Sequence, residues 1–189
     1  MLFELKPGLV PEGYGESILS LAAAKAHCRV LTTDDDDLIE ALRDAAVDAV
    51  EQMTMKYLAP RTGLIWVGAG FGADMVLGKG PDADITAIEY DDTAGVVQTL
   101  DAGAWRIGVH GRILPAVGTS WPSDCGGEVR ITFDAGFAAG AVPGALVAAV
   151  RMLTVHFYDN REAVITGSIA VDVPFGVQQL VNLHRMPVI

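Results

Sequence analysis

The 189-residue sequence contains only two cysteines, Cys28 and Cys125, and they lie far apart. Two cysteines are too few for a zinc knuckle or a disulfide scaffold, so both thiols are expected to be free in a reducing compartment. No stretch approaches the roughly 18 uninterrupted apolar residues of a membrane-spanning helix. The N-terminus also lacks a basic region followed by an apolar run. The sequence therefore predicts neither a membrane span nor a secretory signal.

Basic residues are scarce, with 13 Lys and Arg against 24 Asp and Glu, and the formal net charge is -11. A field of that sign repels nucleic acid and anionic lipid, so non-specific DNA binding is disfavoured. The charge is uneven, because residues 143–189 carry three acidic and three basic residues. Charged residues are depleted at the centres of interfaces. The C-terminal quarter is therefore predicted to meet a partner.

Hydrophobic residues make up 51% of the chain, which is enough to build a folded core. Apolar side chains at helical spacing predict helices over Leu21–Cys28, with Ser20 as N-cap, and over residues 38–57 and 143–161. Short β-rich runs punctuated by Gly, Pro and Asp predict strands at residues 64–67, 85–90, 96–100, 105–109 and 129–133. The predicted fold class is α+β, a bundle of about three helices with an inserted antiparallel β region and an extended C-terminal arm.

The predicted organisation is one structural domain with four parts. Residues 1–60 supply an N-terminal arm and core helices, and residues 61–137 form the β-rich insertion. Residues 138–165 supply a C-terminal core helix. Residues 166–189 form a docking arm that ends in a short helix near residues 177–183, because Gly167 and the Pro174-Phe175-Gly176 turn interrupt any longer helix.

A glycine-rich run, Gly68-Ala69-Gly70-Phe71-Gly72-Ala73, matches a dinucleotide-binding fingerprint after a predicted strand. That chemistry needs a helix whose N-terminus holds the pyrophosphate. Only four residues separate the run from Gly78, so no adequate helix follows, and a hairpin tip is the preferred interpretation. Gly78-Lys79-Gly80 fails as a phosphate-binding loop, because no Ser or Thr follows in the required place.

Residues 34–37 are four consecutive aspartates, but a calcium loop starting there would need glycine and glutamate where the chain has Ile39 and Ala45. Acids at this position are predicted to cap the following helix and to offset its positive end. The four histidines lie apart, and no serine or cysteine stands in a nucleophile motif. The sequence predicts no catalytic residue, no cofactor and no metal ligand.

Two stretches resemble the head-tail connector, or adaptor, family of long-tailed phages, prophages and gene transfer agents. The first runs from Leu21-Ala22-Ala23-Ala24 through the acidic turn and the long helix, and the second runs from Val142-Pro143 to His156-Phe157-Tyr158-Asp159-Asn160-Arg161. Gly118-Thr119-Ser120-Trp121-Pro122 is similar to the β insertion of larger members, and Val173-Pro174-Phe175-Gly176-Val177 is similar to their tail end. Cys28 stands where such proteins tend to carry an aliphatic residue, a minor departure because a buried cysteine packs as a small hydrophobe.

The resemblance implies a structural virion protein of the neck and no enzymatic activity. It implies a ring, expected to be dodecameric, between a portal protein and a stopper or tail-completion protein, with DNA passing through without specific binding. The predicted docking residues on the arm are Val171, Val173, Phe175, Val177, Leu180, Val181 and Leu183. The alternative for these residues is an arm that folds back on its own helices. The alternative functions are another neck protein, such as a stopper or tail-completion protein, and a small nucleotide-binding enzyme.

Overall fold

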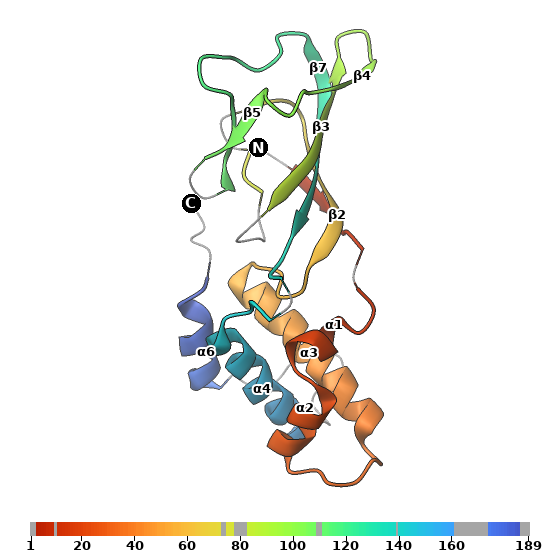
Figure 1. Cartoon of the computed structure of the whole chain (residues 1–189), viewed down its shortest axis with the longest axis vertical. Coiled ribbons are helices and arrows are strands. Elements are labelled where there is room, and N and C mark those ends of the chain that lie inside the picture. Colours follow the sequence, from red (N-terminus) through yellow and green to blue (C-terminus); the bar gives the residue numbers. More distant parts are fainter. Residues whose placement is uncertain are drawn as a thin grey trace. The chain divides into compact units, whose positions relative to one another are not determined.

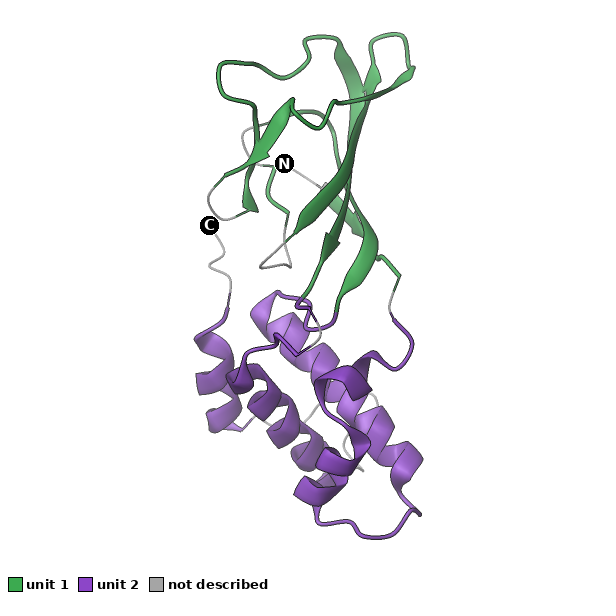
Figure 2. Ribbon diagram, viewed as in Figure 1, with its two compact units in different colours: residues 1–10, 60–136 green, residues 11–59, 137–189 purple. Residues whose placement is uncertain are grey.

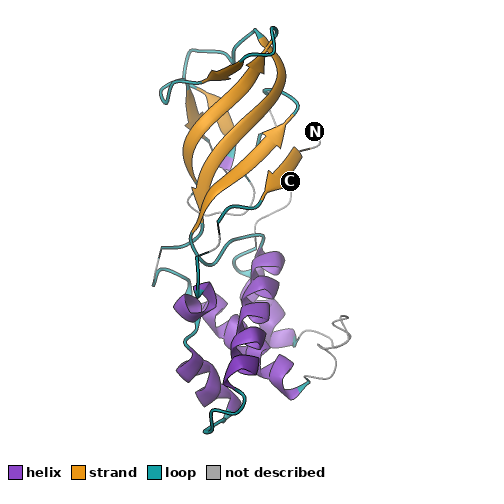
Figure 3. Ribbon diagram, turned by 90° about the vertical axis from the view of Figure 1, so that its right-hand side faces the viewer, coloured by secondary structure: helices purple, strands orange, loops and turns teal. Residues whose placement is uncertain are grey.

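The computed structural model describes residues 3–9, 11–72, 75–77, 83–108, 111–138, 140–160 and 174–185. The chain divides into two compact units (Figure 2). Unit 1 comprises Met1–Val10 and Pro60–Gly136 and contains the strands. Unit 2 comprises Pro11–Ala59 and Phe137–Ile189 and contains the helices (Figure 3). The predicted α+β fold class, with antiparallel strands between helical segments, is confirmed.

Unit 1 is built on a five-stranded antiparallel sheet with the order β1-β2-β7-β3-β4 (Figure 1). Its strands are β1 (Phe3–Lys6), β2 (Arg61–Gly68), β3 (Asp84–Asp92), β4 (Val97–Thr99) and β7 (Cys125–Ala135). A two-stranded sheet pairs β5 (Trp105–Ile107) with β6 (Ile113–Pro115). The structure adds β1 and β6 to the strands that the sequence predicted.

One face of the large sheet is apolar because side chains on a strand alternate between two faces. Along β7, buried Val129, Ile131 and Phe133 alternate with the partly exposed Arg130 and Thr132. Cross-strand partners continue this buried face: Trp66 of β2 and Ile88 of β3 both stand opposite Ile131. The alternation fixes the register, since a slip by one residue would turn the apolar set toward water.

Unit 2 is a helical bundle whose elements are α1 (Tyr14–Ile18), α2 (Leu21–Cys28), α3 (Asp36–Thr54), α4 (Gly144–Asp159) and α6 (Phe175–Asn182). The longest helices, α3 and α4, pack against each other, α2 contacts both, and α1 packs on α3. The core consists of buried aliphatic side chains from several helices, including Leu42, Ala46 and Val50 of α3 and Leu146, Val150 and Leu153 of α4. The predicted helix at Leu21–Cys28 is confirmed, and the Ser20 hydroxyl accepts a hydrogen bond from the Ala23 amide at 3.2 Å.

The predicted role of the aspartates before α3 is wrong in one respect. Asp35 is the N-cap residue of α3, but its side chain makes no capping hydrogen bond. The Asp35 carboxylate instead accepts a hydrogen bond from the Tyr158 hydroxyl at 2.6 Å, and Asp36 pairs with Lys25 at 2.5 Å. The carboxylates of Asp35 and Asp36 thus bind side chains of α4 and α2 instead of capping the amides of α3. Asp36 and Asp37 still lie in the first turn of α3, as predicted, where negative charge offsets the positive helix end.

The C-terminal end of α3 is closed by a left-handed residue and by hydrogen bonds to Glu51. Met55 adopts a left-handed conformation with φ 57°, and the Lys56 amide donates to the Glu51 carbonyl. The buried Glu51 carboxylate accepts a hydrogen bond from the Leu58 amide at 2.7 Å. A charged acceptor therefore satisfies a backbone donor that the end of the helix leaves buried.

Replacing Leu153 with alanine is expected to lower the free energy of unfolding by about 2–5 kcal/mol, because Leu153 is fully buried in the bundle and its loss leaves a cavity. Chemical denaturation followed by circular dichroism measures the change. Leu31→Ala is the matched control, since Leu31 is 96% exposed, and it is expected to change stability by no more than about 0.5 kcal/mol. Equal effects of the two substitutions would contradict the packing of α4 described above.

Candidate interaction surfaces

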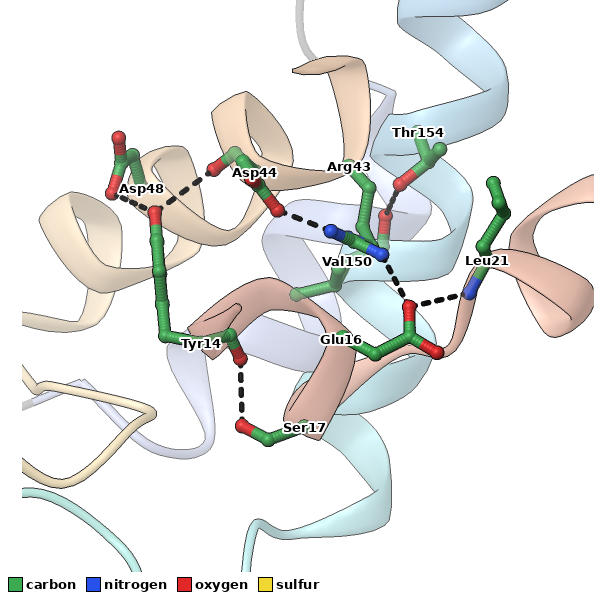
Figure 4. Close-up of polar contacts among 9 residues, drawn as sticks. All are labelled: Tyr14, Glu16, Ser17, Leu21, Arg43, Asp44, Asp48, Val150 and Thr154. Atoms are coloured by element: carbon green, nitrogen blue, oxygen red, sulfur yellow. Dashed lines mark hydrogen bonds and ion pairs between the residues drawn. The ribbon is translucent and has the colours of Figure 1, made fainter. Parts of the chain in front are cut away.

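The most extensive polar cluster of unit 2 surrounds the buried Arg43 side chain (Figure 4). Arg43 donates to the Glu16 carboxylate at 2.6 Å and to the Asp44 carboxylate at 2.9 Å. The same Glu16 oxygen accepts from the Leu21 amide at 2.8 Å. The Tyr14 hydroxyl donates to Asp48 at 2.8 Å. The cluster therefore ties α1 and the first residue of α2 to α3.

This cluster is suited to holding helices together, not to catalysis. The Arg43 side chain is only 4% exposed, whereas the Glu16 and Asp44 side chains are 52% and 41% exposed. Two half-exposed carboxylates offset the desolvation of one buried guanidinium. Burial, followed by the hydrogen bond to Asp48, raises the pKa of Tyr14 well above its ordinary value, so the phenol stays protonated and keeps donating. The cluster has no nucleophile paired with a base.

A charged residue within an apolar helix face points to this cluster in the sequence, although the sequence analysis did not predict it. Arg43 lies within the apolar stripe of α3, next to the buried Leu42 and between Ile39 and Ala46. A charged residue on the buried side of an amphipathic helix requires a partner of opposite charge. The partner, Glu16, lies 27 residues earlier in a five-residue helix that the sequence did not predict.

In unit 1, two neighbouring aspartates at the end of β3 have lowered pKa values for structural reasons. Hydrogen bonds from the Arg130 guanidinium, at 2.5 and 3.3 Å, lower the pKa of Asp91. Amide hydrogen bonds led by that of Val96, together with one from the Gln98 side chain, lower the pKa of Asp92. Both carboxylates are thus ionised acceptors that fix the β3–β4 turn and the pairing of β3 with β7.

The glycine-rich run at the end of β2 does not form a dinucleotide site within the described residues. A side chain at Gly68 would collide with the indole of Trp66, so glycine is needed there to accommodate a core tryptophan. Phe71 stacks on Trp121 with ring centroids 4.7 Å apart and meets Tyr90 edge-on at 5.4 Å. No helix begins in residues 69–72 or 75–77. Gly78-Lys79-Gly80 lies outside the described residues.

Metal, disulfide and membrane features are absent from the described part of the chain. No three His, Cys, Asp or Glu side chains there gather into a group that could hold a metal ion. Cys28 and Cys125 are both free and partly buried, and burial raises the pKa of the Cys28 thiol. No described helix has the length and apolarity needed to cross a membrane.

The predicted docking residues of the arm differ in their burial. Val177 and Val181 are buried in the bundle core, and the partly buried Leu180 packs against it. These three are therefore not part of an exposed docking surface, because α6 folds back on α4 and α3. Phe175 and Leu183 remain 74% and 77% exposed. Val171 and Val173 lie outside the described residues.

A family model described as phage gp6-like head-tail connector protein matches residues 18–82. A chain in the virion of a native gene transfer agent particle is 29% identical, with a TM-score of 0.72, and the match covers 98% of this chain and 96% of that chain. The predicted resemblance to the head-tail connector family is confirmed. A search of curated proteins found no match.

Two further similar structures come from necks of the same kind of particle. One is the neck of an empty particle computed with C6 symmetry, with 28% identity, a TM-score of 0.71 and coverage of 100% and 97% of the two chains. The other is the neck of a native particle computed with C12 symmetry, with 29% identity, a TM-score of 0.70 and coverage of 100% and 97%. Both units of this chain are therefore shared with the similar neck chains, since the matches span its whole length.

Replacing Arg43 with methionine is expected to lower the free energy of unfolding by about 1–3 kcal/mol, because the charged hydrogen bonds that join α1 to α3 are lost. Denaturant titration measures the loss. Asp37→Asn is the control, since Asp37 is exposed, and a change below about 0.5 kcal/mol is expected there. A stability of the Arg43 variant equal to that of the control would mean that the cluster does not hold α1.

Proposed function

We propose that this chain is a structural subunit of the neck of a phage-like particle, where it forms a ring between the portal and the stopper or tail. The observation that carries this proposal is the likeness over the whole chain to chains in gene transfer agent necks. The connector family match at residues 18–82 favours a connector over a stopper or tail-completion protein. The symmetries of the similar necks, C6 and C12, support an assembly of several copies.

The chemistry of the described residues agrees with a structural role. The polar clusters around the buried Arg43 and around the partly exposed Asp91 satisfy their own charges and hold elements together. A net charge of -11 suits a protein that lines a DNA channel without gripping the phosphate backbone. In the proposed ring, acidic side chains that face the channel repel the genome as it passes.

The proposal is tested on purified particles from producing cells. The chain is expected in the particles at a copy number that is a multiple of six, measured by quantitative mass spectrometry and by averaging of neck images. Deletion of its gene is expected to leave filled heads without tails, and expression of the wild-type chain restores tails. Tailed, infectious or DNA-transferring particles that lack the chain would overturn the proposed function.

The exposed residues of the arm, Phe175 and Leu183, are proposed to contact the portal. Removing the whole arm is a poor test, because it also removes Val177 and Val181 from the core. The double variant Phe175→Ser/Leu183→Ser keeps the core, and its affinity for the portal is expected to fall at least about tenfold because two large apolar contacts are lost. Surface plasmon resonance with immobilised portal measures the affinity.

The matched control for the arm is Leu9→Ser/Val96→Ser, which removes two other exposed apolar side chains. This control is expected to bind the portal like the wild type. Equal affinity of the arm variant and the wild type, with both folded by circular dichroism, would show that Phe175 and Leu183 do not form the docking surface.

A further inference from the structure

One segment of unit 1 carries basic residues and no acidic ones. Residues 102–123 contain no aspartate or glutamate, although the whole chain carries 24 acidic residues. The same segment contains Arg106 and Arg112, so its net charge is positive although the net charge of the protein is -11. It includes the two strands β5 and β6.

The two arginines lie on one face of the β5–β6 hairpin. Arg106 stands opposite Leu114, and Arg112 precedes Leu114 by two residues, so the pleat turns all three side chains to the same side. Arg106 and Arg112 are exposed, and neither forms an ion pair with any other residue that the structure describes. Arg106, Arg112 and Leu114 are called here the basic hairpin surface.

Backbone hydrogen bonds hold this hairpin in place. The Leu77 amide donates to Gly111, and the Ile113 amide donates to Met75 at 2.8 Å. The Gly108 amide donates to Arg112 at 2.7 Å, and the Ile113 side chain is fully buried. A surface that is already ordered loses little conformational entropy when it binds.

Helix α3 of unit 2 carries a surface of opposite charge. Asp37, Glu40, Asp44 and Asp48 follow one another at spacings of three, four and four residues, which places them in one stripe along the helix. Asp37, Glu40 and Asp48 are exposed, and the Asp44 side chain is 41% exposed. Among described residues, Asp37 and Glu40 have no basic partner. These four residues are called here the acidic stripe.

We infer that the basic hairpin surface of one copy docks on the acidic stripe of the next copy. The inference rests on the proposed ring. A closed ring requires a heterologous contact, in which two different surfaces of each copy are complementary. Each copy then binds one neighbour with the first surface and the other neighbour with the second. The basic hairpin surface and the acidic stripe are such a pair, because they are different surfaces of opposite charge.

The spacing of the charges is compatible with this contact. Diagonal neighbours in a two-stranded sheet lie about 7–8 Å apart. Carboxylates three or four residues apart on a helix lie about 5–6 Å apart at Cβ. Two arginines with long side chains can therefore each reach a different carboxylate of the stripe. Contact with DNA is less favoured, because two arginines supply few phosphate contacts and the remaining charge of the chain repels DNA.

The test uses charge reversal in the full-length chain. Sedimentation equilibrium at physiological ionic strength and up to about 1 mM protein measures self-association, a range that detects affinities near 1 mM. The variants Arg106→Glu/Arg112→Glu and Asp37→Lys/Glu40→Lys are each expected to weaken self-association at least about tenfold. An equimolar mixture of the two variants is expected to associate again, because every junction between unlike copies then joins opposite charges.

The control variant Lys6→Glu/Arg185→Glu has the same net charge as the hairpin variant, but it changes exposed residues elsewhere. It is expected to associate like the wild type. The interface is overturned if the wild type associates but the reversals have no effect, or if the mixture of folded variants stays dissociated. It is also overturned if the hairpin variant instead loses affinity for double-stranded DNA in fluorescence anisotropy. A wild type that does not associate at all overturns this direct contact between copies, whereas the ring itself is tested by the copy number in purified particles.

Discussion

The packing of α3 against α4 is the contact on which the other helices of unit 2 depend. The seam contains small side chains, Ala46 and Ala149, that are fully buried beside larger aliphatic ones. Small residues at a seam allow two helices to approach closely. Helices of five to eight residues are not stable alone in water, so α1, α2 and α6 form because this pair gives them an apolar surface to cover. The core side chains of α6, Val177 and Val181, bind the C-terminal segment to the bundle for the same reason.

In unit 1, β7 has the corresponding role at the centre of the sheet. It pairs with β2 on one side and β3 on the other, and every second side chain from Val129 to Ala135 is buried. The strand is 11 residues long, so it provides backbone partners for both neighbours over most of their lengths. A bulge in β2 near Gly63 adjusts the end of this pairing, with φ 68° at Gly63 and a hydrogen bond from its amide to Asp134. Glycine is favoured there because other residues are strained at that φ.

Elements with strong periodicity or strong capping were predictable from sequence. The helix at Leu21–Cys28 combines an alanine-rich stretch with a serine cap, and α3 and α4 each present an apolar stripe over several turns. Elements that depend on distant partners were not predictable. Helix α1 is one example, because Glu16 is positioned by Arg43, which lies 27 residues further along the chain. Strand β1 is another, since Phe3–Lys6 alternate apolar and polar residues over only four positions, and this short segment becomes a strand by pairing with β2.

The predicted docking residues show the same limit of sequence reasoning. A run of valines and leucines after a proline has the same composition whether it covers its own core or a partner. Burial of Val177 and Val181 depends on the position of α6 against α4, which a single sequence does not specify. Exposed Phe175 and Leu183 flank these residues at the two ends of α6, so one helix both closes the bundle and presents apolar groups outside it.

Charge distribution constrains how such a chain can assemble. Each added copy brings a net charge of -11, so copies repel one another at long range, and this repulsion is screened beyond about 8 Å at physiological ionic strength. Contacts are therefore favoured at short range and at places where acidic residues are absent or are matched by arginine. Two such places are the acid-free residues 102–123 and the neutral residues 143–189. In the proposed neck these two places serve different contacts, the first with the acidic stripe of the next copy and the second with the portal, while the other acidic residues are left to face water or the passing DNA.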